Sequence, residues 1–534
     1  MKHRLLYIPI AFLFILSFTD CAKRGRPTGG LKDSIPPVII KSSPENYSIH
    51  FNENEIKIYF DEYVKLKDLN KELIISPPFK NQPNITPLST SKFIKIKFTD
   101  TLKENTTYSF NFGKSIVDNN EENAFKYFKY IFSTGSFIDS LSLRGNINDA
   151  LLLKRESATT VMLYEVNEAF KDSIVYLEKP TYITSTQDST DIFELSNLKK
   201  GDYLLVALEE NNNDYMFQPQ NDKIGFANTI ITIPTDSAYT INLFKETPEY
   251  SLTKPKHESK NHIIFGYQGD AKNLELELAS EVSKDFEAIS YKDRETDSIH
   301  YWFKPSIEND SLLFYAKNGL WLDTLNTRMR DLHQDSLKIS AIKSGILTLN
   351  DTLSITANTP IVSLNLEKIT IMDKDSLDIT VNGIMDKEYN TTDIIFSMTE
   401  GQNYTIQFLP GAFTDFYENT NDTLVTRVRT KALSDYGTLA LTLSNAKDFP
   451  YIIQLVTERF KVISEEYLST DQEAFFDFIT PGKYYIRIIY DENENKIWDT
   501  GNYLKGLQPE KVIYYPSLLE VRANWSLNET FILD

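Results

Sequence analysis

The six histidines and the single cysteine are the most chemically versatile side chains in this 534-residue sequence. The histidines are scattered along the chain, at His3, His50, His257, His262, His300 and His333. Their spacing fits no zinc motif, and there is no Gly-x-Ser-x-Gly, His-Glu-x-x-His or phosphate-binding glycine loop. Paired carboxylates are expected in so acidic a chain and do not indicate glycoside hydrolysis. We therefore predict no catalytic residues and no enzymatic activity.

One acidic loop, DENENKIWDTGN at residues 491–502, has the spacing of a calcium site. Its oxygen-bearing candidate ligands are Asp491, Asn493, Asn495 and Asp499. Lys496 stands where a glycine usually makes the turn, and Asn502 stands where a bidentate glutamate is usual. The alternative is a loop held by side-chain to backbone hydrogen bonds, with no cofactor. A weaker copy, EENNNDY, occupies residues 209–215.

Cys21 cannot form an intramolecular disulfide, because it is the only cysteine. It follows a basic start and an apolar run of 14 residues, Leu5 to Phe18, which is too short for a bilayer-spanning helix of roughly 20 residues. We predict a lipoprotein signal at 1–20, with cleavage before Cys21 and acylation of its thiol. Phe18 and Asp20 depart from the usual processing motif. The alternatives are an ordinary signal peptide with an incidental thiol, or a short membrane anchor.

Residues 21–35 are rich in Gly, Pro and basic residues, and we expect them to form a flexible spacer. The remaining chain has no second apolar run near 20 residues, so we expect a soluble body held to the membrane by its lipid anchor. The formal net charge of −19 becomes −20 without Lys2, Arg4 and Asp20. Nucleic acid is therefore excluded as a partner.

The rest of the sequence has the alternating apolar and polar pattern of half-buried β-strands. Examples are EIKIYFDEYV (55–64), KFIKIKF (92–98), TLALTLSN (438–445) and KYYIRIIY (483–490). Clusters of Asn, Asp, Gly, Pro and Ser separate these segments. We predict an all-β fold of tandem β-sandwich domains.

Two pairs of segments recur in the same order, which predicts a duplicated two-domain unit. Residues 108–135 and 404–431 both run from an alternating strand, through an Asp/Asn-rich loop, to a second strand that ends on Thr134 or Thr430. Residues 198–215 and 479–496 both place a glycine before an aromatic-led strand that ends in an acidic loop. The alternative is chance similarity between short β segments.

The first domain resembles the bacterial Ig-like domain named for the S-layer protein SbsA, because PPVIIKSSPENYSIHF, EIKIYFDEYV, ELIISPP and IFSTG occur in the expected order. The stretch CAKRGRPTGGLKDSIPP is similar to the opening of Ig-like-domain outer-membrane lipoproteins of Bacteroidota. FELSNLKKGDYLLVALEENNN resembles the core of prealbumin-type or carboxypeptidase-regulatory-like sandwiches. The resemblance covers residues 21–245, is weaker over 360–534, and implies scaffold or binding modules.

The expected domains follow from these repeats and resemblances. They are a signal peptide (1–20), a lipidated spacer (21–35), an Ig-like domain (36–136), a prealbumin-like sandwich (137–247), a middle β domain of unknown type (248–352), a second Ig-like domain (353–432) and a second prealbumin-like sandwich (433–534).

Asp-Ser or Asp-Thr followed by Ala, Ile, Leu or Thr occurs 13 times. This pattern resembles the O-glycosylation signal of exported Bacteroidota proteins, with the hydroxyl as acceptor. The alternative is that these pairs start turns before strands. The predicted acceptors are Ser34, Thr101, Ser140, Ser173, Ser298, Ser311, Thr324, Ser336, Thr352, Ser376 and Thr423.

We predict a lipid-anchored structural or accessory subunit that docks on an outer-membrane protein complex. The family resemblance suggests the β-barrel assembly machinery as partner. We expect a position on the cell surface rather than in the periplasm, although basic residues 23–26 differ from acidic surface-export signals. One alternative is a surface glycan- or polymer-binding protein, with Trp302 or Trp321 stacking on sugars. Another is an enzyme within the middle domain.

Overall fold

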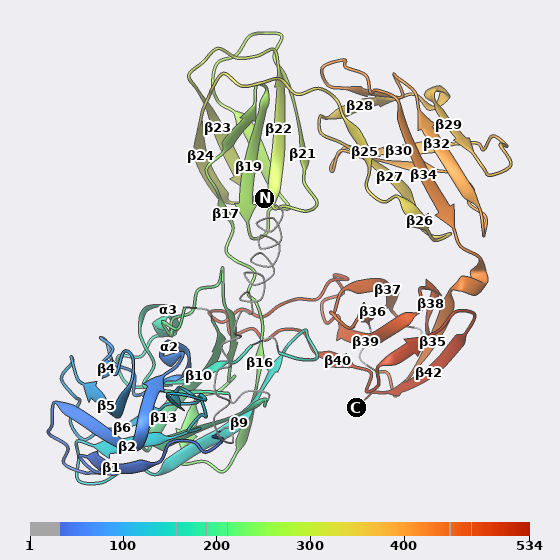
Figure 1. The fold of residues 1–534 in the computed structure, drawn as a ribbon. Coiled ribbons are helices and arrows are strands. Elements are labelled where there is room, and N and C mark those ends of the chain that lie inside the picture. The colour runs from blue at the N-terminus through green and yellow to red at the C-terminus, as the bar shows by residue number, and fades with distance from the viewer. Residues whose placement is uncertain are drawn as a thin grey trace, which may run out of the picture. The chain divides into compact units, whose positions relative to one another are not determined.

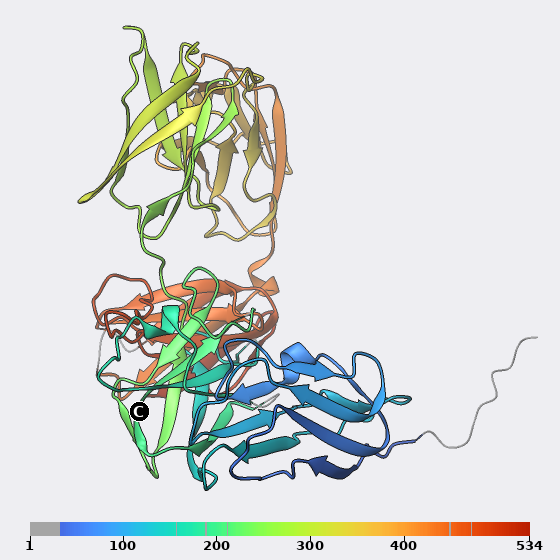
Figure 2. The same cartoon turned by 90° about the vertical axis from the view of Figure 1, so that its left-hand side faces the viewer.

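The computed structural model describes residues 33–155, 157–186, 190–210, 212–447, 450–470 and 473–533. The signal peptide, Cys21 and most of the spacer lie outside these ranges. The described chain is almost entirely strand and loop (Figure 1, Figure 2). Its helical elements are single turns: α2 (Leu69–Glu72), α3 (Ile174–Leu177), η1 (Leu366–Lys368) and η2 (Leu433–Asp435). The predicted all-β, tandem-sandwich fold is therefore confirmed.

The chain divides into two compact units. The first ends at Ser142 and also takes in Pro180–Thr184 and Leu195–Lys200, and the second holds the remainder. None of the described helices has the length and apolar character needed to cross a membrane. The strands of the two units fall into five successive sandwiches.

The first sandwich packs a sheet of order β1-β2-β5-β4, with β7 added on β2, against a sheet of order β3-β6-β8. Ile56, Ile58 and Phe60 alternate along β2 and point into the core with Phe110 and Phe132. The strands are β1 (Ile39–Ser43), β2 (Glu55–Leu66), β3 (Ile74–Ser76), β4 (Asn84–Thr86), β5 (Ser91–Lys97), β6 (Thr107–Asn111), β7 (Ile116–Asp118) and β8 (Lys129–Ser133).

The second sandwich has sheets of order β11-β10-β13-β14, with β15 on β13, and β12-β9-β16. Strands β9 and β16 pair in parallel, whereas β10 and β13 are antiparallel. The strands are β9 (Leu141–Asp149), β10 (Thr160–Glu165), β11 (Tyr182–Ser185), β12 (Ile192–Leu198), β13 (Gly201–Glu209), β14 (Lys223–Phe226), β15 (Ile231–Ile233) and β16 (Ala238–Leu243).

The fifth sandwich repeats this topology strand for strand. Its sheets have the order β37-β36-β39-β40, with β41 on β39, and β38-β35-β42, and β35 and β42 are again parallel. The strands are β35 (Gly437–Ser444), β36 (Tyr451–Thr457), β37 (Val462–Leu468), β38 (Glu473–Ile479), β39 (Gly482–Tyr490), β40 (Val512–Tyr514), β41 (Leu519–Val521) and β42 (Ser526–Ile532). The repeated strand order supports the predicted duplication.

The third sandwich has sheets of order β17-β19-β22-β21, with β18 on β19, and β20-β23-β24. Its own core includes Phe265, Phe303 and Phe314. The strands are β17 (Ser251–Leu252), β18 (Lys256–Ser259), β19 (His262–Gln268), β20 (Leu274–Leu278), β21 (Glu287–Lys292), β22 (Ser298–Lys304), β23 (Ser311–Asn318) and β24 (Trp321–Arg328).

The fourth sandwich starts earlier than the expected residue 353. Strands β25 and β26 precede that residue, yet β25 pairs with β27 and β26 pairs in parallel with β34. The boundary at 352/353 is therefore wrong. The strands are β25 (Ile339–Ala341), β26 (Gly345–Leu347), β27 (Leu353–Ala357), β28 (Ile361–Leu364), β29 (Ile369–Met372), β30 (Asn382–Asp386), β31 (Thr391–Ile395), β32 (Asn403–Phe408), β33 (Phe413–Asp415) and β34 (Leu424–Thr430).

The first and fourth sandwiches share a tyrosine hydrogen bond. The Tyr108 hydroxyl accepts from the Lys103 backbone N–H at 2.9 Å, and the Tyr404 hydroxyl accepts from the Thr399 N–H at 2.7 Å. In both, the donor lies five residues before the tyrosine. Both tyrosines are buried, so the bond satisfies a loop N–H at the edge of the core.

A threonine at the end of each repeat makes a second shared contact. The Thr134 hydroxyl accepts from the Thr106 N–H at 2.9 Å, and the Thr430 hydroxyl accepts from the Gln402 N–H at 3.0 Å. Each hydroxyl also donates to a backbone carbonyl, of Lys103 or Thr399. These are the threonines at which the predicted repeats end.

Candidate functional site

The predicted calcium loop lies between β39 and β40. Asp491 is only 1% exposed and accepts hydrogen bonds from the backbone N–H groups of Asn495 and Lys496, at 3.1 and 2.9 Å. The side-chain amides of Asn493 and Asn495 both donate to Asp499 Oδ2. The structure therefore brings all four predicted residues into one hydrogen-bonded loop.

Glu510 joins this loop from the segment just before β40, and the sequence pattern did not identify it. Its carboxylate accepts from the Glu492 N–H at 2.8 Å and from the Asp499 N–H at 2.9 Å. Burial raises the pKa of Glu510, and the nearby charges of Asp499 and Asp491 add to the shift. A negatively charged, partly buried carboxylate of this kind would be stabilised by a cation.

The geometry of the loop also fits the alternative without a cation. The amide oxygens of Asn493 and Asn495 accept from the N–H groups of Asn495 and Ile497, at 3.1 and 2.9 Å. A cation would require both amides to rotate so that their oxygens face Asp499, which would break these two turn bonds. Calcium binding at this loop stays a prediction.

The weaker copy of the loop, in the second sandwich, is organised around Glu210. Its Oε2 accepts from the N–H groups of Asp214 and Tyr215, both at 3.1 Å. Burial raises the pKa of Glu210 to about 7, and Asp214 and Asp222 add to the shift. Its other oxygen is buried and accepts no hydrogen bond among the described residues.

Two histidines that are distant in the sequence, the buried His262 and the half-buried His300, meet in the third sandwich. His262 Nε2 is 3.0 Å from His300 Nδ1, because β19 and β22 are neighbours and the two side chains share one face. The His262 ring stacks on Trp302 with centroids 3.8 Å apart. Asp293 Oδ2 lies 3.6 Å from His300 Nε2.

Burial keeps both histidines neutral. It lowers the pKa of His262 to about 3, with a further contribution from His300, and it also lowers the pKa of His300. Across the described residues, no three His, Cys, Asp or Glu side chains gather as metal ligands. The two rings contact each other through His262 Nε2 and His300 Nδ1.

The two middle-domain tryptophans differ in exposure. Trp302 is 2% exposed and cannot present a face to a sugar. Trp321 is half-buried, and its ring meets Tyr250 edge to face at 4.9 Å between centroids. Of the two tryptophans proposed to stack on sugars, Trp302 is therefore excluded and only Trp321 remains a candidate.

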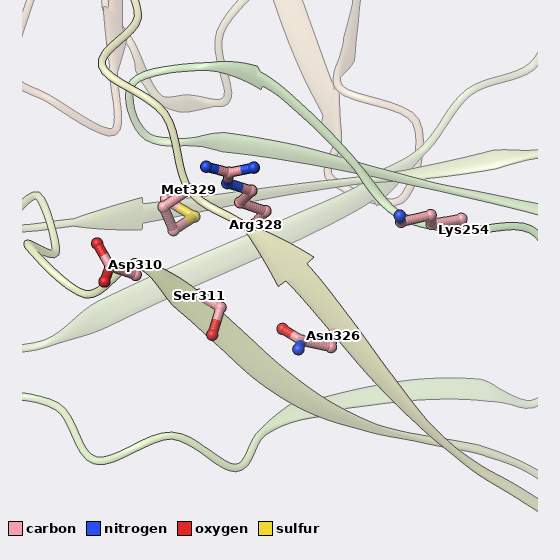
Figure 3. A pocket seen from close by; sticks show the side chains of 6 residues that line it. All are labelled: Lys254, Asp310, Ser311, Asn326, Arg328 and Met329. Atoms are coloured by element: carbon pink, nitrogen blue, oxygen red, sulfur yellow. The ribbon is translucent and has the colours of Figure 1, made fainter.

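A polar hollow lies at one end of the β23–β24 hairpin (Figure 3). Ser311 and Arg328 are directly opposite each other across the two strands, and Asn326 lies two residues from Arg328 on the same face. The remaining lining residues are Lys254, Asp310 and Met329. The lining combines two cations with one carboxylate and contains no histidine or cysteine, so it offers hydrogen bonds to a polar group but no paired nucleophile and base.

Most predicted glycan acceptors lie on the surface. Nine are exposed, Ser173 is half-buried, and Ser298 is only 6% exposed with its hydroxyl 2.9 Å from that of Thr296. A glycan on Ser298 would therefore require local opening of β22. The exposed acceptors are Ser34, Thr101, Ser140, Ser311, Thr324, Ser336, Thr352, Ser376 and Thr423.

Comparison with protein families assigns the first sandwich. Residues 33–134 match a family model described as "Bacterial Ig-like domain". This match covers the whole first sandwich and agrees with the resemblance inferred from its sequence. No curated protein matches the chain.

Solved structures give only distant matches. The Bacillus anthracis TIE protein is 12% identical, with 95% of this chain and 76% of that chain covered and a TM-score of 0.15. Domains 1–6 of surface layer protein SbsC are 11% identical, with 88% and 67% covered and a TM-score of 0.15. The titin domains A168–A170 are 10% identical, with 52% and 98% covered and a TM-score of 0.14. Values this low identify neither a family nor a function.

Proposed function

We propose that this chain is a non-enzymatic structural protein of the bacterial cell envelope, anchored by a lipid on Cys21. One observation carries the proposal: a series of five sandwiches, in which the fifth repeats the topology of the second, follows a lipoprotein-like leader. The first, third, fourth and fifth sandwiches each have their own cluster of buried apolar side chains, so each of these sandwiches can keep its fold without a ligand. The resemblance of the leader supports an outer-membrane position, whereas its basic residues 23–26 differ from acidic surface-export signals.

The finer proposal is that the sandwiches dock on an outer-membrane protein complex, with the β-barrel assembly machinery as the first partner to test. An apolar hairpin tip in the third sandwich supports a protein contact. Leu320, in the β23–β24 turn, is fully exposed, and Leu322 and Tyr315 are 73% and 52% exposed beside it. Exposed apolar groups that gather in this way mark interaction sites.

A pull-down with a tagged chain from detergent-solubilised outer membranes tests this function. We expect co-recovery of a membrane protein complex at a fixed ratio, and loss of that complex from the Leu320→Asp, Leu322→Asp variant. Val425→Asp, on an exposed strand position of the fourth sandwich, is the matched control. Recovery of the chain alone, together with binding to glycan columns, would favour the glycan-binding alternative.

A further inference from the structure

Charge is distributed very unevenly along this acidic chain. Residues 33–136, the first sandwich, carry 13 lysines and 13 acidic residues. Residues 137–534 carry 37 basic and 61 acidic residues, which is a net charge of −24. The first sandwich is therefore neutral while the other four are strongly acidic, and its lysines stand out against the remainder of the protein.

Several of these lysines share the outer face of one sheet, formed by β1, β2, β5 and β4 (Figure 1). Across β2 and β5, Glu55 pairs with Lys97 and Lys57 pairs with Lys95. The residues between these pairs, such as Ile56 and Ile96, are fully buried, so the lysines point away from the core. We call the outward residues Lys41, Lys57, Tyr59, Phe93, Lys95 and Lys97 the lysine face.

Positive charge on this face is only partly neutralised by the protein itself. Glu55 Oε1 lies 2.7 Å from Lys57 Nζ, and Glu55 is the one carboxylate in these two rows of paired residues. The pKa of Glu55 is lowered, first by its hydrogen bond with Lys57 and then also by Lys95 and Lys97. Like charges directly opposite each other cost stability, so an external anion bound beside Lys57 and Lys95 would reduce their repulsion.

Aromatic side chains continue the lysine face toward the edge strand. Tyr59 pairs with Phe93, with ring centroids 5.7 Å apart, and Lys41 Nζ lies 5.0 Å from the Tyr59 centroid. Val38, just before the edge strand β1, and Ile40, within that strand, are also exposed. Lysines next to tyrosine and exposed aliphatic groups are the composition of surfaces that bind the interfacial layer of a membrane.

The short distance in sequence between Cys21 and the first sandwich would place the lysine face near a bilayer if Cys21 carries a lipid. The described chain begins at Asp33 and runs directly into β1, where the Val38 N–H donates to Asp61 Oδ1 at 2.9 Å. Only 11 residues lie between Cys21 and Asp33, so the distance between these two residues is at most about 40 Å. A lipid on Cys21 would therefore hold the first sandwich near the headgroups, and the segment that joins them enters at the edge of the lysine face.

We propose that the lysine face docks on the anionic headgroup layer of the bilayer in which the chain is anchored. This step rests on the proposed lipid anchor for its location, but the binding itself comes from residues of the first sandwich. The phosphates of anionic lipids would pair with Lys57, Lys95 and Lys97, and the aromatic rings would enter the interface. The other four sandwiches, with their combined net charge of −24, would be repelled by the same surface.

Vesicle binding tests this proposal without the anchor. The chain from residue 21 onward, with Cys21→Ser, is sedimented with vesicles of phosphatidylcholine alone or mixed with phosphatidylglycerol. We expect binding to the mixed vesicles only, and an affinity at least about tenfold lower for the Lys57→Gln, Lys95→Gln, Lys97→Gln variant. A matched control, Lys71→Gln, Lys103→Gln, Lys126→Gln, removes the same charge from exposed positions elsewhere in the sandwich and should bind as the unmodified chain does.

Each other result contradicts the proposal. Equal binding by the two triple variants would assign the effect to net charge or to the basic leader. Loss of self-association in the first variant, with vesicle binding unchanged, would show that the face binds an acidic surface of a second copy. Thermal unfolding of both variants checks that the sandwich is intact. The vesicle assay uses a chain without a lipid, so a negative result would contradict the lysine-face proposal but not the lipid anchor. Conversely, the absence of a lipid on Cys21 in cells would contradict the anchor but not the vesicle binding.

Discussion

Lys57 lies directly opposite Lys95 in the β2–β5 pair, with both side chains on the outer face of the first sandwich. Two like charges at this spacing repel each other, so each weakens the pairing of its own strands. Since the core beneath them is fully buried and aromatic-rich, the sandwich tolerates the repulsion.

Lys95→Glu should therefore stabilise the isolated chain, because it replaces a repulsive pair with an attractive one. We expect a gain of about 0.5 kcal/mol at low salt, and loss of that gain at about 1 M salt, where the Debye length falls to about 3 Å. Thermal unfolding of the variant and of the unmodified chain at the two salt concentrations measures this difference in stability. The control is Lys103→Glu, and an equal gain there would show that the pairing with Lys57 is not responsible.

The shared tyrosine hydrogen bonds should contribute equally to the stability of the first and fourth sandwiches. Tyr404→Phe and Tyr108→Phe each leave one loop N–H without its acceptor, which costs about 1 to 2 kcal/mol. Hydrogen exchange of the Thr399 and Lys103 amides reports each site separately. Unchanged exchange in either variant would show that the hydroxyl is not needed there. Tyr315→Phe, at an exposed hydroxyl, is the control.

The third sandwich should lose stability in acid. The pKa of His262 is about 3 in the folded chain and about 6.5 in an unfolded one, so the unfolded state binds the proton first. Stability is therefore full above pH 6.5 and falls as the pH drops toward 3, by up to about 1.4 kcal/mol per pH unit.

Hydrogen exchange of β19 and β22 between pH 7 and 4 measures this loss. His262→Phe should flatten the profile, because it keeps a ring against Trp302 and removes the titrating group. His333→Gln, at an exposed side chain, should leave the profile as it is. A profile that keeps its slope in His262→Phe would contradict the assignment.

Calcium should stabilise the fifth sandwich if the loop at 491–499 binds it. We expect about 1 to 2 kcal/mol at millimolar calcium, which is the affinity range of extracellular modules. Asp491→Asn and Asp499→Asn should abolish the effect, whereas Glu458→Gln, at an exposed loop position of the same sandwich, should not. Isothermal titration calorimetry measures calcium binding directly. The absence of a binding heat would show that hydrogen bonds alone hold the loop, without a cation.

The strands were the most predictable part of the structure, because alternation records which face of a sheet is buried. Residues 55–64 and 92–98 were recognised in this way, and they form β2 and most of β5. Strands β25 and β26, each three residues long, carry too little pattern to be recognised. For that reason the sequence pattern places the start of the fourth sandwich at residue 353, after these two strands.

Contacts between strands could not be predicted, because they depend on register. His262 and His300 are 38 residues apart and meet only because β19 pairs with β22. Lys57 and Lys95 were visible as alternating lysines, but only the β2–β5 register makes them a pair. The four calcium candidates were found because all lie in one loop, while Glu510 comes from a later segment.

The central claim, that this is a lipid-anchored envelope protein, is tested most directly by the mass of the mature N-terminus in its native host. We predict that the chain begins at Cys21, that this residue carries acyl chains, and that Cys21→Ser moves the protein out of the membrane fraction. The same spectra would show hexose-rich additions at exposed acceptors such as Ser311. A mature N-terminus elsewhere, or an unmodified Cys21 in a protein that stays soluble, would contradict the account.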